Sequence, residues 1–455
     1  MSADSGRVHT AHLRWLTIHG SGLAMNAASV EVTPRAPRLS VARLGGRGWR
    51  ALRHPNYRLY FFGQVVSQSG TWLQRIAQAW LVLDLANSPA ALGVLTVFQF
   101  TPALLLSLVA GVVADRVGKQ RLIMITSTLE AVQALALAAV TLSGAVQLWH
   151  VYVLAFLLGL FTTFETPARQ AFVSDLVPRE DIQSAVALNS SVFNAARIVG
   201  PGIGGVVLAA WGAGWAFALN GVSFVAVLAA LAMLDTSKLY GRRSAARGAL
   251  WTQVWDGVRH AAHAPSLAFP LALLAVVGML GYNFGVVLPL LARYTLDIGA
   301  VGFGALNAAM GVGSLLGALL LTPHLPPGTR TVALAALGFS GVLLAVALVP
   351  WYAAILGLLG LLGLISVSYS TSTNTTLQLA SGEAYRGRIL SLYTLLFMGT
   401  TPIGGAVTGL LADSLGITRT LAVEACVCLV ATLVGMLYLN RARRTKQASD
   451  ATLAA

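Results

Sequence analysis

The sequence predicts an all-α polytopic membrane protein, with twelve transmembrane helices in two six-helix bundles and both termini in the cytoplasm. Of its 455 residues, 56% are apolar and only 10% are charged, so lipid rather than water must cover most of the surface. The chain also holds twelve long apolar runs, each near the roughly 20 residues that a helix needs to cross a hydrocarbon core of about 30 Å. Its basic residues gather on one side when these runs are threaded through a bilayer.

The apolar runs fall into two sets of six, separated by a polar stretch. The first set lies near residues 59–86, 91–114, 121–143, 148–172, 186–210 and 214–234, and the second near 267–292, 300–322, 330–349, 351–378, 388–412 and 417–440. We therefore expect a bundle over 53–234, a cytoplasmic linker over 235–266, a second bundle over 267–440 and a cytoplasmic tail over 441–455. Residues 1–52 predict a disordered basic cytoplasmic arm; mitochondrial targeting or a later start near Met25 are alternatives.

The orientation follows from the positions of the 30 Lys and Arg residues. With the amino terminus inside, only Arg293 and Arg419 fall on the outer side, while Arg75 and Arg197 lie within spans. Cytoplasmic segments of membrane proteins carry such an excess of cations. This rule also explains the net charge of +14 better than nucleic-acid binding does, because a nucleic-acid binder would carry its cations on a far less apolar chain.

Four of the predicted helices, at positions one, four, seven and ten, carry polar side chains at helical spacing. Lipid cannot satisfy such stripes, so they must face other helices or a water-filled cavity. An isolated Ser or Thr often only joins neighbouring helices, but four striped helices predict a central substrate cavity between the bundles. Its predicted lining residues are Gln64, Gln68, Thr71, Arg75, Gln78, Thr162, Tyr282, Asn283, Asn374 and Gln378.

Four charged residues lie near the middle of predicted spans, all in the first half: Arg75, Glu130, Glu165 and Arg197. An unpaired charge at this depth costs several kcal/mol, so we expect mutual pairing or an aqueous cavity. A carboxyl whose contact with Arg changes between two states can take up a proton in one and release it in the other. We therefore predict proton coupling, with Glu165 as the first candidate and Glu130 as the second; a permanent salt bridge is the alternative.

Energy for transport must come from an ion gradient or from the gradient of the substrate. The sequence holds no phosphate-binding Gly-rich loop followed by Lys-Ser or Lys-Thr and no soluble domain large enough to hydrolyse ATP. Cys426 and Cys428 point to different sides of one helix, which argues against a disulfide or a metal site. We expect no enzyme activity and no cofactor, with a small molecule, protons and the lipid bilayer as partners. The sequence gives no sign of oligomerisation, so we expect a monomer.

Two segments then identify the chain as resembling the major facilitator superfamily over residues 53–440. Residues 53–59 read Arg-His-Pro-Asn-Tyr-Arg-Leu and resemble the branch of bacterial siderophore and macrolide exporters. The loop at 111–121 is similar to the signature between the second and third helices of the superfamily. The resemblance implies a conformational latch in this loop, with Arg169 of the fourth span as a partner for Asp115. A basic turn that only sets topology is the alternative. The predicted latch comprises Gly111, Asp115, Arg116, Gly118 and Arg169.

The fifth span carries a second motif, which resembles the Gly-Pro signature of the superfamily's antiporters. It contains Gly200, Pro201, Gly204 and Gly205, and a related Pro-Ile-Gly-Gly run follows 200 residues later in the eleventh span. Pro201 removes a backbone hydrogen bond, which offers a hinge or a fixed bend. One departure is Ala196, where the pattern usually has Gly, and this weakens the antiporter assignment.

Together the motifs imply a secondary active transporter of the plasma membrane, most simply a proton-coupled exporter of a small amphipathic drug, macrolide-like compound or siderophore by alternating access. A nutrient importer or facilitator is one alternative. A transporter-like membrane sensor or scaffold is another.

Overall fold

The computed structural model describes residues 48–241, 256, 258–262 and 264–454, without the side chains of 108, 115, 384 and 442–454. Within these residues the regular structure is helical, and eleven segments are long and apolar enough to cross a membrane. Helix α2, Pro55–Ala86, has 32 residues and the length to span, but it is not among the eleven because its polar stripe lowers its mean hydropathy. The predicted all-α membrane architecture is confirmed, and the twelfth span remains a prediction.

The N-terminal bundle consists of six long helices with short connections. Proline begins α2 and α3, where its missing N–H is not needed, and Gly212 ends α6 with a φ of 83° that other residues rarely adopt. The elements are η2 Arg50–Arg53, α2 Pro55–Ala86, α3 Pro89–Arg116, α4 Lys119–Leu142, α5 Leu148–Asp175, η3 Arg179–Asp181, α6 Ile182–Trp211 and α7 Ala213–Ala232.

The C-terminal bundle is less regular, because two of its predicted spans are interrupted. The seventh breaks at Tyr282 and Asn283, and the eleventh breaks at Thr400, two residues before Pro402. The elements are α9 Pro265–Gly281, α10 Phe284–Leu290, the π-turn η5 Leu291–Thr295, α11 Ala300–Leu316, η6 Gly317–Leu321, η7 Thr322–His324, α12 Thr329–Leu348, α13 Tyr352–Ala380, α14 Gly382–Gly399, α15 Thr401–Leu415 and α16 Ile417–Ala454.

The predicted arm and tail differ from the structure where they meet the bundles. Ala51 is fully buried and Arg50 Nε lies 3.2 Å from Asp181 Oδ1, so residues 48–52 dock against the start of α6 and the disordered arm predicted to residue 52 is wrong there. Residues 1–47 lie outside the described part of the chain. The tail predicted from residue 441 continues α16 as helix to Ala454. Most of the predicted linker, 242–255, is likewise outside the described part.

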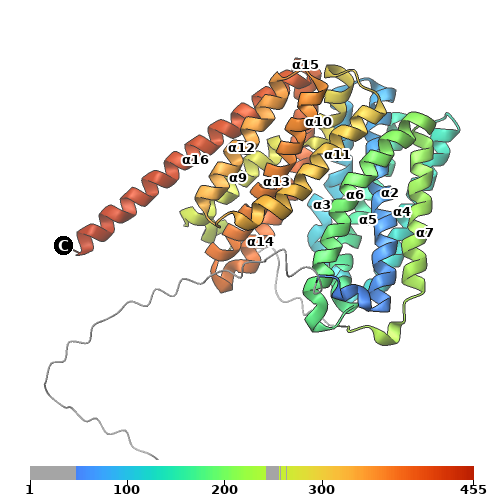
Figure 1. Ribbon diagram of the computed structural model, residues 1–455, viewed down its shortest axis with the longest axis horizontal. Coiled ribbons are helices and arrows are strands. Elements are labelled where there is room, and N and C mark those ends of the chain that lie inside the picture. The colour runs from blue at the N-terminus through green and yellow to red at the C-terminus, as the bar shows by residue number, and fades with distance from the viewer. Residues whose placement is uncertain (1–47, 242–255, 257, 263, 455) are drawn as a thin grey trace, which may run out of the picture. The chain divides into compact units, whose positions relative to one another are not determined.

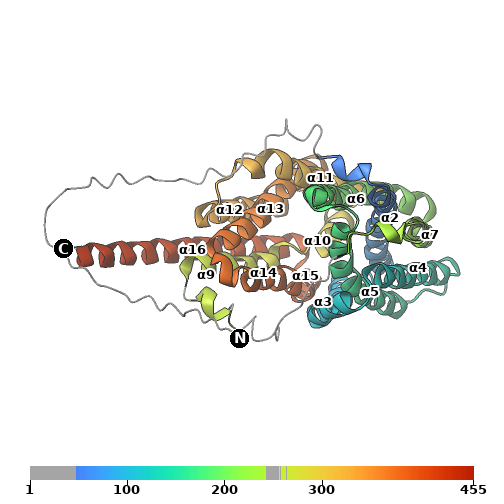
Figure 2. The ribbon, with the colours of Figure 1, turned by 90° about the horizontal axis from the view of Figure 1, so that it is seen from below.

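Two seams join the bundles, α6 against α11 and α3 against α15, and both views show these helices side by side (Figures 1 and 2). Glycines permit the close approach. A Cβ on Gly205 of α6 would lie 2.7 Å from the carbonyl oxygen of Ala300, and one on Gly93 of α3 would lie 2.8 Å from that of Gly405. Because the Gly pairs of α6 and α15 come from the two related motifs, the repeat in the sequence corresponds to a repeat in packing.

The buried apolar side chains show that the bundles share a core at one end only. The largest hydrophobic cluster combines residues of both bundles, including Trp80, Leu92 and Phe303. Two further clusters lie each within one bundle: one surrounds Tyr60 and Phe172, and the other contains Leu377. We call the shared end, formed by residues 84–90, 293–300 and 411–417, the closed end.

Candidate functional site

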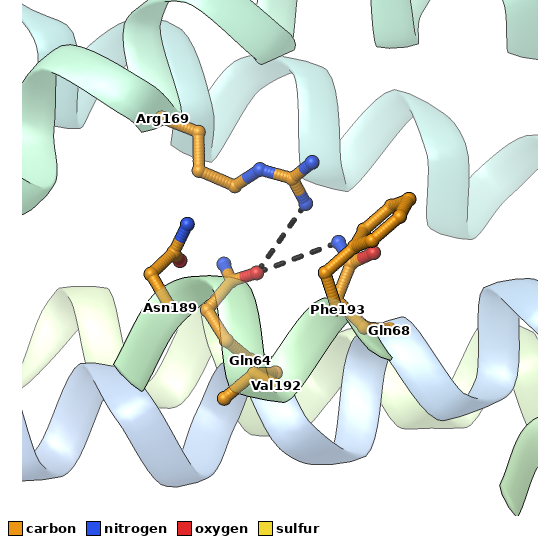
Figure 3. Close-up of a pocket in the computed structure, with 6 residues that line it drawn as sticks. All are labelled: Gln64, Gln68, Arg169, Asn189, Val192 and Phe193. Atoms are coloured by element: carbon orange, nitrogen blue, oxygen red, sulfur yellow. Dashed lines mark hydrogen bonds between the residues drawn. The ribbon is translucent and has the colours of Figure 1, made fainter. Parts of the chain in front are cut away.

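A small polar cavity lies within the N-terminal bundle (Figure 3). Its volume of about 20 Å³ is enough to hold a water molecule. The Gln64 side-chain oxygen accepts hydrogen bonds from Arg169 Nη1 at 3.4 Å and from Gln68 Nε2 at 3.5 Å. Gln64 and Gln68, predicted for the substrate cavity, thus lie beside Arg169, which was predicted for the latch. The cavity is lined by Gln64 and Gln68 of α2, Arg169 of α5, and Asn189, Val192 and Phe193 of α6.

The contribution of α6 to this cavity was missed by the sequence analysis. Asn189 and Phe193 are four residues apart and therefore lie on one face of the helix. The signal was present, because Asn189, Ser190 and Asn194 interrupt an otherwise apolar segment.

Glu165 occupies the interior of the same bundle, one turn from Arg169. Only 5% of Glu165 is exposed. Its Oε2 accepts hydrogen bonds at 3.4 Å from the hydroxyls of Thr126 and Ser127, and its Oε1 lies 3.8 Å from Arg169 Nη1. The ion pair with Arg169 is therefore long, and neutral hydroxyls provide the other contacts.

Glu130 is a second buried carboxyl, and it faces the first. Its Oε1 accepts a hydrogen bond of 2.7 Å from Thr162 Oγ1, and its carboxyl lies within hydrogen-bonding reach of Glu165. Two ionised carboxylates this close repel each other, so the two acids and the nearby Arg169 are electrostatically coupled.

Two arginines complete the charged interior of the N-terminal bundle. Arg75 lies 4.8 Å above the ring of Trp72, and its buried Nε has no hydrogen-bond partner. Arg75 is within electrostatic range of Glu130, Arg169 and Arg197. The cluster thus contains three arginines and two glutamates, an excess of one cation if both acids are ionised and of two if one acid holds a proton.

Other predicted cavity residues of the first half pack against helices. Gln78 is 1% exposed and donates to the backbone oxygen of Val151 at 3.4 Å, which joins α2 to α5. Thr71 donates to the carbonyl of Ser67 in its own helix at 3.0 Å. Thr162 is held by Glu130, as described above.

The predicted residues of the second half do not meet at one point. The Tyr282 hydroxyl donates to the carbonyl of Ser366 at 2.7 Å, whereas Asn283 points into the bundle interior and is only 3% exposed. Asn374 and Gln378 hydrogen-bond to each other along α13. The structure therefore gathers the charged cluster in the first half and leaves polar groups dispersed in the second.

The predicted latch is resolved in part. The side chain of Asp115 lies outside the described residues, so its pairing with Arg169 stays a prediction. The same loop is held by another ion pair, Lys119 Nζ to Asp175 Oδ2 at 2.6 Å, between the start of α4 and the end of α5. Nothing lies within 4 Å of a Cβ built on Gly111 or Gly118.

The predicted hinge lies within an unbroken helix, since α6 continues through Pro201. A Cβ on Gly200 would lie 2.6 Å from Trp72 Cβ, and one on Gly204 would lie 3.3 Å from Leu73 Cα, both in α2. Gly205 instead contacts α11 of the other bundle. The motif thus presents one face to its own bundle and one to the opposite bundle.

Polar contacts between the bundles gather at the closed end. Arg293 Nη1 lies 3.2 Å from Asp84 Oδ1, and Ser88 Oγ donates to Asp413 Oδ1 at 2.8 Å. Beneath them Trp80 stacks on Phe303 with ring centroids 5.7 Å apart. The ion pairs and side-chain hydrogen bonds that join the two bundles in the described part of the chain lie at this end.

Two helical bundles joined by Gly-lined seams, with a charged cluster inside the first bundle, are typical of a transporter of the major facilitator type, a multi-pass membrane protein and not an enzyme. A family described as transmembrane secretion effectors matches residues 47–454, and the chain belongs to this family. Similar solved structures include a bacterial homologue of the human lysosomal transporter Spinster in an inward-facing, unoccupied conformation, with a TM-score of 0.63, 15% identity and coverage of 84% of this chain and 95% of the other. A POT family transporter in complex with 5-aminolevulinic acid has a TM-score of 0.68 and 12% identity, and the match covers 84% of this chain and 95% of the other. At these identities the likeness shows the fold alone.

Curated relatives match over most of their length. The staphyloferrin A transporter of Staphylococcus aureus is 26% identical over 397 residues, covering 86% of this chain and 97% of the relative. The multidrug efflux pump Tap of Mycolicibacterium fortuitum is 27% identical over 380 residues, covering 80% and 90%.

Proposed function

We propose that the protein is a secondary active exporter, which uses the proton gradient to move a small amphipathic molecule out of the cytoplasm by alternating access. The observation that carries this proposal is the buried pair Glu130 and Glu165, which can share a proton beside Arg169 and the polar cavity. A carboxyl whose Arg contact is long in one state and short in another would change its proton occupancy between states.

The topology is part of the proposal: α2 supplies the twelfth span, and both termini are cytoplasmic. The distribution of Lys and Arg favours this orientation. The closed end is then the outer end, and the conformation is inward-facing. We keep the predicted boundaries of the two bundles, 53–234 and 267–440, and propose that the linker between them lies on the cytoplasmic side. We retain the latch, Gly111, Asp115, Arg116 and Gly118 with Arg169, and the hinge at Pro201 as proposals for how this state changes.

The substrate class is proposed from charge and from the relatives. Three arginines face two glutamates in the N-terminal bundle, so a substrate that carries an acidic group would balance the charge. Phe193 at the cavity offers an apolar surface. A siderophore or an amphipathic drug meets this description, consistent with relatives that transport staphyloferrin A or export several drugs.

A growth panel followed by a flux assay tests the proposal. Cells with and without the protein are compared across antibacterial compounds and iron chelators, and efflux of the compound that separates them is measured in energised cells. We expect efflux to collapse with a protonophore. Inward accumulation would instead indicate an importer, and no flux for any compound would indicate a sensor or scaffold.

The acid pair is tested in the same assay. Glu165→Gln and Glu130→Gln are expected to lower proton-driven efflux at least about tenfold, because an amide cannot exchange a proton. Glu180→Gln, the same change at an exposed position of η3, is the matched control and is expected to keep wild-type flux. Wild-type efflux by both buried variants would refute proton coupling through this pair.

A further inference from the structure

Glu424 of α16 is a buried carboxyl of the other bundle and has no part in the site described above. Only 2% of Glu424 is exposed. Its Oε1 accepts a hydrogen bond of 2.6 Å from Thr408 Oγ1 of α15, and its Oε2 is buried without a hydrogen-bond partner. One neutral hydroxyl is therefore the hydrogen-bond donor that the structure provides to this acid.

The direction of that hydrogen bond is fixed by a neighbour. Asn283 Nδ2 donates to Thr408 Oγ1 at 2.8 Å, so the single hydroxyl proton of Thr408 is free to point at Glu424. Asn283 lies where α9 gives way to α10, and its Oδ1 is also buried and unpartnered. Broken helices with unsatisfied oxygens beside a buried acid are typical of coupling-ion sites in transporters.

Among the residues that the structure describes, no cation on the elements around Glu424 faces its carboxyl. Of the elements packed on α16, α9 and α10 carry no titratable residue in their described length, and α12 carries only Arg330, at its first turn. At the closed end α15 brings Asp413 and η5 brings Arg293 and Tyr294, all partly or well exposed. On α16 itself Arg419 is exposed, and the buried thiol of Cys428 lies one turn further on.

Tyr369 of α13 reaches the same interior beside Cys428. An ionised carboxylate in this place would be desolvated and uncompensated. The carboxyl therefore needs a proton, or a bound cation, to remain buried.

We propose that Glu424 is a proton-binding site, and that its protonation is the condition for closing the seam between α15 and α3. Glu424 is the seventh residue after the start of α16, about 10 Å from the closed end, so water can reach it there once α15 separates. The proton would come from the medium on that side.

The contacts of α15 link this acid to the seam. Thr408 is followed by Gly409, where a Cβ would lie 2.9 Å from Gly93 Cα and 3.0 Å from the Pro89 carbonyl oxygen of α3. The helix is thus packed between α3 on one side and the Glu424 interior on the other. A charge on Glu424 demands water, and moving α15 away from its neighbours would admit water and open the seam.

This inference rests on the proposed alternating-access transporter, but it concerns a different residue, a different bundle and a different measurement. Glu130 and Glu165 are tested by flux. Glu424 is tested by the pH dependence of the distance across the closed end.

The experiment places spin labels at Ser143→Cys and Ser414→Cys, exposed positions at the closed end of the two bundles, in full-length protein in lipid nanodiscs. Exposed Cys426 is replaced by Ala, buried Cys428 is kept, and a sample without the introduced cysteines checks for stray label. We expect the distance distribution to shift from short to long as the pH rises from about 5 to 9, because deprotonation opens the seam. Glu424→Gln is expected to keep the short distance at every pH.

Three controls make the outcome decisive. Glu165→Gln is expected to keep the pH dependence of the distance, which separates this site from the acid pair. Thr408→Val removes the hydroxyl that stabilises the ionised carboxylate, so the midpoint is expected to rise by about one pH unit, and this variant also serves if Glu424→Gln does not fold. Replacing NaCl by choline chloride is expected to change nothing.

Two results would overturn the proposal. The first is a Glu424→Gln protein whose distances titrate as in the wild type, with an unshifted midpoint for Thr408→Val. The second is a distance set by sodium rather than by pH, which would make the site a metal-cation site. If Glu424→Gln titrates as the wild type does while Glu165→Gln abolishes flux, the inference on Glu424 falls and the proposed function stands. If Glu424→Gln keeps the short distance at every pH while Glu165→Gln transports normally, the inference on Glu424 stands and proton coupling through the acid pair falls.

Discussion

Replacing Gly205 by Ala tests whether the seam between α6 and α11 sets the conformation. The added Cβ would lie 2.7 Å from the carbonyl oxygen of Ala300 and 3.0 Å from Gly304 Cα, whereas ordinary contacts begin at 3.4 Å. Both opposing atoms are backbone, so neither can rotate away, and α11 must shift by several tenths of an ångström. Overpacking of this kind costs about 1–3 kcal/mol.

That cost applies only while the seam is closed, so it acts on the conformational equilibrium. A difference of about 1–3 kcal/mol shifts the ratio of closed to open molecules by about 5- to 150-fold toward the open form. The matched control is Gly202→Ala, three residues earlier in the same helix, where nothing lies within 4 Å of the new Cβ. Both variants gain the same helix propensity, about 0.5–1 kcal/mol, so the comparison isolates the contact.

The assay is the distance between labels at residues 143 and 414 at fixed pH. We expect Gly205→Ala to populate long distances and Gly202→Ala to match the wild type. Identical distributions for the two variants would show that the close approach of α6 and α11 does not control the closed end, and the reasoning from glycine packing would have to be given up.

Three further predictions concern charged groups. Lys119→Ala removes the ion pair with Asp175, in which both side chains are mostly buried. This variant is expected to lose about 1–3 kcal/mol of the free energy of unfolding, seen as a lower unfolding temperature of the purified protein. An unchanged unfolding temperature would count against a role for this contact. Asp84→Asn breaks a half-exposed ion pair at the closed end, so we expect a change within about 1 kcal/mol that vanishes at high salt, and a salt-independent larger effect would contradict this. Hydrogen bonds, the largest from Lys238, lower the pKa of Asp235 to about 2, so the contribution of Asp235 to stability is complete above its ordinary pKa and is lost only as the pH falls through about 2. Asp235→Asn is therefore expected to leave the pH dependence of the closed-end distance between pH 5 and 9 unchanged. Any shift of that pH dependence would disprove this prediction.

The regular parts of the fold were predictable because apolar length and glycine spacing are local properties. The runs at 121–143 and 148–172 match α4 and α5 within a few residues, and Gly205 of the predicted Gly-Pro motif lies where α6 approaches α11 closely. The polar stripe of α2 contributes Gln64 and Gln68 to the small cavity of the N-terminal bundle, while the central substrate cavity between the bundles stays a prediction.

The breaks in helices and the partners of buried acids were not predictable, because they depend on the opposing bundle. Asn283 reads as part of a continuous seventh span, yet it leaves the helix and bonds Thr408, 125 residues away. Glu424 had no account from the sequence, since its single hydrogen-bond donor lies on another helix. A single sequence holds the residue types for such contacts but not the pairing.

The apolar cluster shared by the two bundles has a thermodynamic consequence. When the closed end separates, side chains such as Trp80 and Phe303 must meet water or lipid headgroups, and exposure of apolar surface to water raises the heat capacity. Because this hydrophobic contribution weakens on cooling, low temperature is expected to favour separation of the bundles there, and modest warming to favour their association. Without substrate, the two bundles would then stay associated at the closed end near growth temperature, and would separate there more often in the cold.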